Sequence, residues 1–378
     1  MRRAPSLLSL LALAPLGLGL LTHCGGPTSD LEPRGEPPRA SATDRPGPGP
    51  VAPTSDCVCG TEPGCPPCPA ATASANPATS PTPGSSGPPI VFPPKAIPPI
   101  HARTAKPGDG EWTPLTVRGL PAGQTSPLFT TVVRPHPIRN FVVVQLVAID
   151  TTRLDLDLIL GTEEPEGTKL PLEKRPGKVA ATDLDRLVAV LNGGFKKRHG
   201  QHGVGKAGEI AQEPNADGCT FAKLADGTYR VRSHSKLLSL LEGFQFFRQT
   251  PPCLVEDGAK NRDTEHELKA KKWGGAEDGN KEIRRSAIGL AEDGRVLYFA
   301  IGDYLTASWL ADGLVAAGIR DAAELDINYS YTRFILYQPA GNGELTVSSP
   351  LLTDLKAPRN EYWREASGRD FFTLLWKR

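Results

Sequence analysis

The chain has 378 residues, of which 39% are hydrophobic, and its formal net charge is +1. This length and apolar content are enough for one large globular domain. The balanced charge gives no basic excess of the kind that nucleic acids require, so we predict no nucleic-acid partner and look for function in individual sites.

The first 23 residues have the layout of a bacterial export signal. Two arginines precede an apolar run from Leu7 to Leu21, and a cysteine, Cys24, follows. Leu21-Thr22-His23-Cys24 is similar to the site at which a lipoprotein cysteine is acylated, although a histidine replaces the usual small residue. We predict an exported protein, either a cell-envelope lipoprotein of the outer membrane or periplasm, held to the membrane by lipid on Cys24, or an extracellular protein. Ordinary signal-peptide cleavage and an uncleaved anchor are the alternatives.

Residues 24–107 are predicted to form a disordered tether. The stretch from Gly25 to Ile100 contains 21 of the 38 prolines and one aromatic residue, so it cannot bury enough apolar surface to offset the entropy of ordering. This tether also carries four clustered cysteines: Cys57, Cys59, Cys65 and Cys68. Their spacing suits a soft metal or two small disulfide loops, and export favours the loops.

Residues 108–378 are predicted to form one globular domain of the α+β or mixed α/β class. We expect a mixed, hairpin-rich β-sheet with a few packing helices. Cys219 and Cys253 both lie in this domain and are the candidate disulfide, although sequence alone does not determine the pairing.

Several elements of this domain can be predicted in chain order. Strands are expected at 140–150 and 154–160, where the second alternates leucines with Asp155 and Asp157 on a solvated face. Hairpins with type I′ turns are expected at Asp226-Gly227 and Asp293-Gly294. A helix capped by Thr306 and ended by Gly318 should follow, and then a strand at 322–325 that ends before Asp326.

The motif Asn192-Gly193-Gly194-Phe195 follows a hydrophobic run. Two glycines permit a tight turn or a positive φ and let backbone N–H groups approach a ligand, while the asparagine offers a donor and an acceptor. A plain turn is the alternative. His199 and His202 follow at a spacing that suits two ligands of one metal ion. No acidic or cysteine residue follows at a spacing typical of a further ligand, so we predict no metal site.

Several separated pieces together resemble the phosphodiester glycosidase domain family, in the same order along the chain. They are the run 141–160, LNGGF at 191–195, residues 254–258, RSAIGLAEDGRVLYF at 285–299, and the helix with AAELD ending at Asp326. The likeness spans about residues 140–345, and LNGGF with RSAIG is its specific part.

The chain departs from the family pattern after Asp326. The family has a run of glycines there, whereas this chain has Ile327-Asn328-Tyr329-Ser330. A β-branched residue and a bulky aromatic residue cannot adopt the positive φ that glycines permit without strain, so backbone approach to a substrate is in question at this segment.

The resemblance implies a set of site residues. Asp326 would act as nucleophile or base, Arg285 would clamp a phosphate or pair with Asp326, and Asp303 would be the second carboxylate. The substrate-binding residues would be Asn192, Gly193, Gly194, Phe195, His199, Asn328 and Ser330.

The expected function is therefore that of an exported glycosidase-like hydrolase. It would cleave sugar phosphodiesters or related glycosidic bonds in envelope or extracellular glycans without a cofactor, and its partner would be a carbohydrate or sugar-phosphate ligand. The alternative is a non-catalytic sugar- or phosphate-binding protein, or a structural envelope lipoprotein, built on the same domain.

Overall fold

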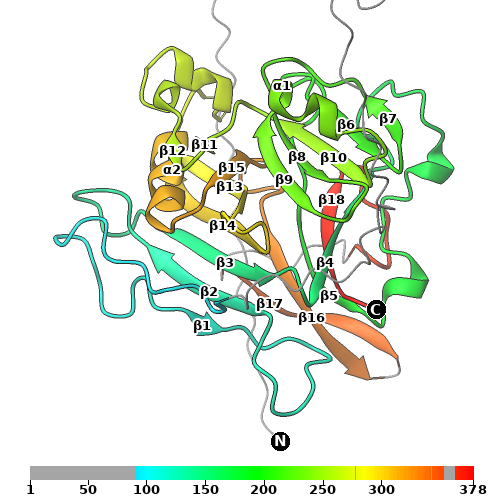
Figure 1. The fold of residues 1–378 in the computed structure, drawn as a ribbon, viewed down its shortest axis with the longest axis horizontal. Helices are drawn as coiled ribbons and strands as arrows, with labels where there is room; N and C mark the ends of the chain where they lie inside the picture. The colour runs from blue at the N-terminus through cyan, green and yellow to red at the C-terminus, as the bar shows by residue number, and fades with distance from the viewer. Residues whose placement is uncertain (1–90, 277, 342, 353–361) are drawn as a thin grey trace, which may run out of the picture. The chain divides into compact units, whose positions relative to one another are not determined.

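The computed structural model describes residues 91–276, 278–341, 343–352 and 362–378. In these residues the chain forms three β-sheets, which we name after one strand in each (Figure 1). The predicted export signal, the lipidation site Cys24 and the cysteine cluster at 57–68 lie outside the described residues.

The β3 sheet has eight strands. In spatial order they are β1 (Thr113–Pro114), β2 (Leu128–Val133), β3 (Val144–Asp150), β14 (Val296–Leu305), β13 (Ile283–Leu290), β15 (Asp321–Glu324), β11 (Val255–Glu256) and β12 (Ala259–Lys260).

The other two sheets have five strands each. The β5 sheet runs in the order β17 (Glu344–Pro350), β16 (Phe334–Gly341), β5 (Leu187–Asn192), β18 (Phe371–Trp376) and β4 (Leu154–Ile159). The β8 sheet runs in the order β7 (Glu209–Gln212), β6 (Val204–Lys206), β10 (Phe246–Thr250), β8 (Cys219–Lys223) and β9 (Tyr229–Ser233).

Helices are short. In the described ranges, the α-helices are α1 (His234–Leu237) and α2 (Ala307–Ala316), and the 3₁₀ turns are η1 (Leu172–Lys174), η2 (Ala181–Asp183), η3 (Leu238–Leu240), η4 (Arg262–Thr264) and η5 (Lys269–Trp273).

The predicted α+β or mixed α/β class is therefore correct only in part, because the described fold is mostly β and its strand pairs are antiparallel. The apolar runs that suggested a mixed sheet come from strands covered on both faces. All eight residues of β13 are buried, for example. Burial on both faces removes the alternation that usually marks an antiparallel strand.

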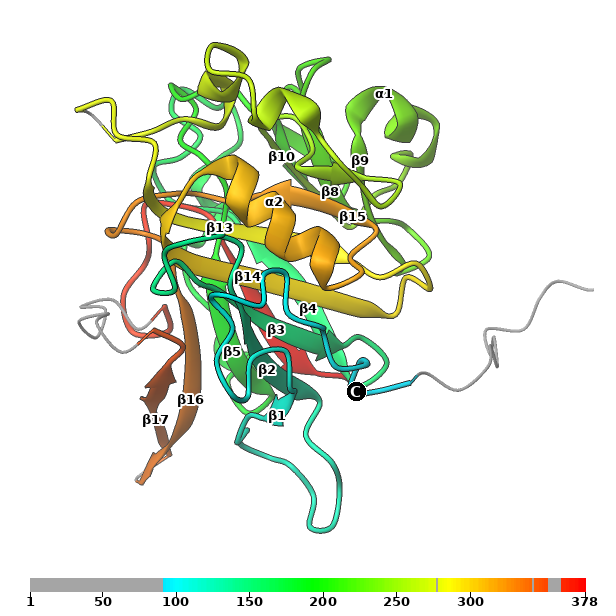
Figure 2. The ribbon, with the colours of Figure 1, turned by 90° about the vertical axis from the view of Figure 1, so that its left-hand side faces the viewer.

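Two hydrophobic layers flank the β3 sheet. One layer joins all three sheets and includes Phe221 of β8, Phe299 of β14 and Phe372 of β18. The other lies between the β3 sheet and α2, which crosses β13 and β14 in Figure 2. Two distinct layers on one sheet explain how a chain with short helices buries a large core.

The predicted helix is confirmed as α2. The Oγ1 of Thr306 accepts the N–H of Trp309 at 3.2 Å, and Gly318 adopts a φ of 71° just beyond the end of the helix. Gly313 faces the sheet, where a Cβ would stand 2.9 Å from a side-chain atom of Val144. Glycine at this position lets the helix approach the strands closely.

Both predicted hairpins form, but their turns are not type I′. Only the glycines have a positive φ, 83° at Gly227 and 70° at Gly294. The preceding aspartates instead accept the N–H two residues later, that of Thr228 from Asp226 and that of Arg295 from Asp293. The aspartate thus favours a type I turn, and the glycine that follows takes the left-handed position.

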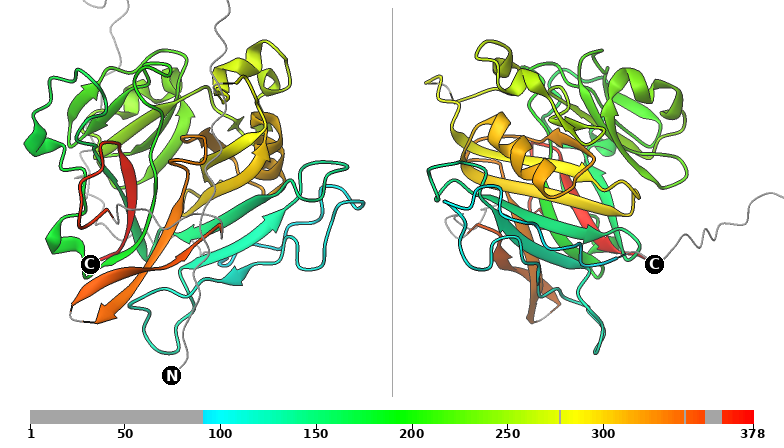
Figure 3. Two further views of the ribbon diagram at one scale, coloured as in Figure 1. Left: turned by 180° about the vertical axis from the view of Figure 1, so that it is seen from behind. Right: turned by 60° about the vertical axis from the view of Figure 1, so that its left-hand side comes forward.

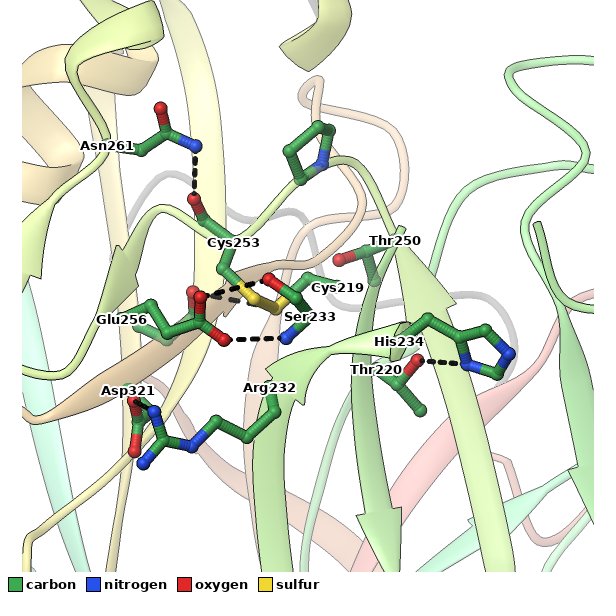
Figure 4. The surroundings of a disulfide bond; sticks show 12 residues. Cys219, Thr220, Arg232, Ser233, His234, Thr250, Cys253, Glu256, Asn261 and Asp321 are labelled. Atoms are coloured by element: carbon green, nitrogen blue, oxygen red, sulfur yellow. Dashed lines mark hydrogen bonds and ion pairs between the residues drawn. A yellow bond between two sulfur atoms is a disulfide. The ribbon is translucent and has the colours of Figure 1, made fainter. Parts of the chain in front are cut away.

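The predicted disulfide between Cys219 and Cys253 is present (Figure 4). It joins the start of β8 to the segment before β11, so it links the β8 sheet to the β3 sheet. Beside it, the backbone N–H and hydroxyl of Ser233 donate to the Glu256 carboxylate at 2.8 and 3.0 Å. A disulfide of this kind belongs in an oxidising compartment, in agreement with the predicted export.

Residues 91–107 pack on the domain, although the sequence assigns them to the tether. Ile97 is buried, and its N–H donates to the carbonyl of Gly110 at 3.0 Å. The indole of Trp112 donates to the carbonyl of Lys95 at 3.0 Å. The packed part of the chain therefore begins upstream of the predicted boundary at residue 108.

Candidate functional site

An open cleft of about 940 Å³ lies where the chain passes between the β3 and β5 sheets. Its walls come from residues 195, 196 and 198–200 after β5, from the end of η5 and the residues that follow, from 326–331 after β15, and from Arg369 before β18. Figure 3 (left) shows the orange loop after β15 between the green part of the chain and the yellow-green segment that contains η5.

Asp326 stands in the wall of this cleft. Its backbone N–H donates to the carbonyl of Gly193 at 3.0 Å, which holds the end of β15 against the end of β5. Its carboxylate lies 2.5 Å from the guanidinium of Arg369, and the two side chains are 7% and 9% exposed. Burial raises the pKa of Asp326 to about 6 although Arg369 opposes the shift, so the carboxylate is mostly ionised at neutral pH.

The Asn192-Gly193-Gly194 motif lies beneath the cleft and does not line it. The Asn192 side chain donates to Ser286 Oγ at 2.9 Å and accepts the N–H of Arg333 at 3.0 Å. Neither glycine has a positive φ. A Cβ on Gly194 would stand 2.6 Å from the guanidinium carbon of Arg248, and one on Gly193 would stand 2.4 Å from the carbonyl oxygen of Asp370. Close packing therefore accounts for these glycines.

Arg285 does not contact Asp326. Its Nη1 lies 2.6 Å from Glu324, and its remaining N–H groups donate to the carbonyls of Leu305, Trp273, Gly274 and Lys281. All five N–H groups are used, so a phosphate clamp at Arg285 would require breaking one of these bonds. Arg285 instead holds the segment that follows η5, which forms one wall of the cleft.

Glu324 is the partner that the sequence did not reveal. Its side chain is fully buried, and burial raises its pKa above the usual range while Arg285 opposes the shift. The expectation of an Arg285–Asp326 pair is wrong because β15 places Glu324, two residues earlier, within reach of Arg285.

Asp303 forms a bidentate ion pair with Arg284 at 2.6 and 2.8 Å, and it does not line the cleft. The guanidinium of Arg284 in turn lies 4.7 Å from the ring centre of Tyr329, which does line it. Asp303 thus supports the rim of the cleft through Arg284, and the role of second carboxylate is not met by this position.

Four predicted binding residues do line the cleft: Phe195, His199, Asn328 and Ser330. Asn328 alone in its segment has a positive φ, of 76°, which asparagine tolerates better than most residues. Ile327 and Tyr329 keep ordinary φ values, and Ile327 packs against Phe195. The departure from the glycine-rich pattern therefore places no strain on those two residues.

Three residues of the site were missed by the sequence reasoning: Arg248, Arg369 and Asp370. Arg248 and Asp370 form a buried ion pair at 2.8 Å, and Asp370 also accepts the N–H of Gly194 at 3.1 Å. Arg369 lies 43 residues after Asp326 in the chain. Its only signal is the Arg369-Asp370 pair just before the last strand, and nothing in its spacing links it to Asp326.

The lining is strongly basic. It contains two acidic residues, Asp326 and Asp278, and five cationic ones: Lys196, Arg198, Lys271, Lys272 and Arg369. Within the described residues Lys196, Arg198 and Lys271 have no carboxylate within 4.0 Å, and Lys272 has one, Asp263, at 3.7 Å.

The pKa of His199 reflects this surplus of positive charge. Burial lowers the pKa of His199, and the charges of Arg198, Arg369 and Lys196 lower it further. The electrostatic potential at the cleft is therefore positive.

The described residues contain no group of three or more histidine, cysteine or acidic side chains that could hold a metal ion. His199 lines the cleft, whereas His202 is buried beside Phe195, with ring centres 5.9 Å apart.

Within the ranges given above, no helix combines the length and apolar composition that a membrane crossing requires.

No family model matches the sequence, and no curated protein matches it either. Among solved structures, the chain is similar to the catalytic domain of zebrafish N-acetylglucosamine-1-phosphodiester alpha-N-acetylglucosaminidase, auto-inhibited by its pro-peptide. The identity is 16%, the match covers 68% of this chain and 90% of that one, and the TM-score is 0.40.

Two further similar structures come from bacteria. A hypothetical protein from Synechocystis matches at 13% identity over 66% of this chain and 62% of that one, with a TM-score of 0.39. A protein described as exported, from Burkholderia pseudomallei, matches at 12% identity over 62% of this chain and 74% of that one, with a TM-score of 0.38. These likenesses assign no role to any residue, and the chemistry of the cleft has to be argued from its own geometry.

Proposed function

We propose that this protein is an exported hydrolase that cleaves the glycosidic bond of a sugar phosphodiester in the cleft. The observation that carries the proposal is a nearly buried carboxylate, Asp326, in the wall of a cleft whose other charged lining residues are mainly cationic. A sugar phosphodiester has both groups that such a site needs, an electrophilic anomeric carbon and an adjacent anion.

The chemistry requires few groups from the protein. The bond between the anomeric carbon and the phosphate oxygen breaks, and its electron pair leaves with a phosphate monoester. A water oxygen bonds to the anomeric carbon and releases one proton. Asp326 in its ionised form acts as the base for that water or as the nucleophile that is later displaced by it. Because the phosphate monoester is a good leaving group, the cations need only stabilise its charge.

Two tyrosines support binding of the sugar itself. Tyr329 and Tyr331 line the cleft and are 48% and 37% exposed. The guanidinium of Arg369 lies 4.0 Å from the ring centre of Tyr331, which fixes that ring beside the carboxylate. Partly exposed rings of this kind offer an apolar face to a sugar.

A second candidate function is binding of the same ligand without hydrolysis. The ion pair between Asp326 and Arg369 favours it, because a carboxylate that is already paired is a weaker base and nucleophile. Among the described lining residues only Asp278, on the segment after η5, offers another carboxylate. Carbohydrate binding at an envelope or extracellular location is common to both candidates, and membrane attachment through lipid on Cys24 is part of the same proposal.

The test compares wild-type protein with Asp326→Asn on a panel of sugar 1-phosphodiesters, including uridine-diphosphate sugars and aryl esters. Wild-type protein should release reducing sugar and phosphate monoester, and the variant should be at least about 1,000-fold slower. Asp312→Asn, on α2 and paired with Lys260, is the matched control and should keep full activity. Equal turnover by the wild-type and Asp326→Asn proteins would remove Asp326 from the reaction. Binding without turnover would favour the second candidate.

A further inference from the structure

The cations of the cleft form two groups that come from different parts of the chain. The first group, Lys196 and Arg198, follows β5, and we name it the β5 cluster. The second group, Lys271 and Lys272, belongs to η5, and we name it the η5 cluster. Both line the same cleft, and the loop after β15, which carries Asp326, lies between their parent segments in Figure 3.

The β5 cluster belongs to the same side of the site as the catalytic carboxylate. The ammonium of Lys196 lies 5.8 Å from the ring centre of Tyr331, and the guanidinium of Arg369, which pairs with Asp326, lies over the same ring. The Nε of Arg198 donates to His199 at 3.2 Å. The β5 cluster is therefore placed to receive the phosphate whose bond to the anomeric carbon is broken.

The η5 cluster is held in place independently. Trp273, the last residue of η5, is fully buried and donates through its indole to the carbonyl of Pro252 at 2.9 Å. Arg285 binds the carbonyls of Trp273 and Gly274. This anchoring fixes the lysines at the cleft although their own side chains are exposed. One carboxylate, Asp278, lines the cleft on the same segment and offsets part of their charge.

One phosphodiester does not account for both clusters. A diester phosphate carries a single negative charge, which Lys196 and Arg198 already exceed, because Asp326 offsets the charge of Arg369. Cations that line one cleft add to its attraction for anions, and the η5 cluster keeps a positive charge although Asp263 lies 3.7 Å from Lys272. A second cationic group on another wall therefore indicates a second anion on the same ligand.

Building on the proposed function, we propose that the natural substrate is a polymer of sugars joined through phosphodiesters, with the scissile phosphate on the β5 cluster and a neighbouring phosphate of the same chain on the η5 cluster. The sugar between the two phosphates lies over the loop that carries Asp326 and Tyr329. The substrate class is thus a repeating sugar phosphate, and a single nucleotide sugar or lone sugar phosphodiester fills only part of the site.

The test measures binding by calorimetry and uses ligands that cannot be hydrolysed, so that its outcome does not depend on catalysis. The ligands are sugar C-phosphonate monoesters, with a methylene group in place of the glycosidic oxygen, prepared from glucose, galactose and N-acetylglucosamine. Each is made with one phosphonate and, as a dimer, with two. We expect the wild-type protein to bind at least one dimer about tenfold or more tightly than its monomer.

Two double variants separate the clusters. Lys196→Ala with Arg198→Ala should weaken both ligands about tenfold or more, whereas Lys271→Ala with Lys272→Ala should weaken the dimer and leave the monomer unchanged. The matched controls are Lys197→Ala and Lys269→Ala, which neighbour the clusters without lining the cleft, and neither should affect either ligand. Thermal unfolding of each variant checks that it is folded.

Three outcomes would overturn the proposal. They are a dimer that binds no more tightly than its monomer for all three sugars, an η5 double variant that binds the dimer as wild type does, and an η5 double variant that loses the monomer to the same extent. Failure of hydrolysis by the wild-type protein would count against the proposed function alone, because these measurements contain no reaction.

Discussion

At the residue scale, the defining feature is the carboxylate of Asp326, which is nearly buried and yet borders a cleft. Burial favours its neutral form, while Arg369 favours its charged form, and burial is the larger of the two effects. A carboxylate poised in this way changes its charge within the range in which enzymes work, which ordinary surface aspartates do not.

The proposed activity should therefore depend on pH through Asp326. Because the reaction needs the ionised form and the pKa is about 6, the rate at pH 5 should be about tenfold below the rate at pH 7. The measurement is kcat/KM for a sugar phosphodiester between pH 4.5 and 8. A rate that rises as the pH falls below 6 would instead assign the protonated acid to Asp326.

His202 should make the folded state sensitive to acid. Burial, aided by Arg248, lowers the pKa of His202 to about 4, whereas an unfolded histidine titrates near 6.5. The unfolded state binds the extra proton between these values, so the stability that the neutral histidine provides is complete above pH 6.5 and is lost as the pH falls toward 4.

His202→Gln removes this titration. Between pH 7 and pH 4.5 the variant should lose about 2–3 kcal/mol less unfolding free energy than the wild type. Urea denaturation at the two pH values measures the difference, and the opposite contribution of Asp326 cancels because both proteins contain it. His266→Gln, at an exposed position, should lose as much as the wild type does. A His202→Gln variant that follows the wild type across this range would exclude His202 as the source.

Part of the lining of the candidate site could be predicted from the sequence. Asp326 was found because it directly follows a strand, and Phe195 and Asn328 were found because they belong to two neighbouring motifs. Arg369 and Arg248 could not be found, since their contacts with Asp326 and Asp370 cross 43 and 122 residues of chain. The predicted partner of Arg285 is wrong because two acidic residues, Glu324 and Asp326, are only two residues apart, and the sequence does not show which of them reaches Arg285.

At the element scale, local sequence signals predicted the hairpins and the helix, but they did not predict which strands pair in each sheet. The hairpins of β8 with β9 and of β13 with β14 and the helix α2 follow from turn residues, caps and hydrophobic spacing. The neighbouring strands β3 and β4 belong to different sheets, which no local signal shows. Asp155 and Asp157 on β4 were expected on a solvated face, but each pairs at 2.6 Å with a lysine of the β8 sheet.

The disulfide is the covalent link between two such elements. Cys219 and Cys253 are 34 residues apart, and closing a loop of that size restricts the unfolded chain by about 3–4 kcal/mol. Cys219→Ser with Cys253→Ser should therefore lower the unfolding free energy by about 2–4 kcal/mol in urea. Wild-type protein reduced with dithiothreitol should unfold at the same urea concentration as the double variant. No difference between oxidised and reduced protein would show that the bond does not contribute.

At the scale of the whole molecule, positive charge is concentrated in the cleft. The chain as a whole carries a formal charge of +1, while the cleft gathers its cations on two walls. The proposed anionic ligand would therefore be attracted by the local field of the cleft and not by the net charge of the chain.

Added salt should weaken ligand binding that depends on this local field much more than it lowers the unfolding free energy. Raising the salt concentration from 0.1 M to 1 M shortens the screening length from about 10 Å to about 3 Å, so affinity for an anionic sugar phosphonate should fall about tenfold. The unfolding free energy should change much less, because most ion pairs in the described residues leave at least one side chain partly exposed, where a pair contributes little, and the buried pairs are poorly screened by salt. Titration calorimetry at the two salt concentrations measures the first effect, and a neutral sugar that also weakens tenfold would contradict the interpretation.

The loop that carries Asp326 is also the strand connection from β15 to β16, and so it is the place where the chain leaves the β3 sheet and enters the β5 sheet. Arg369, the ion-pair partner of Asp326, lies just before β18, which belongs to the β5 sheet. A ligand seated here would rest on the junction between two independently paired sheets. Amide hydrogen exchange should then slow in both sheets together when ligand is present, far beyond the residues that touch it, because opening either sheet would first require the ligand to leave.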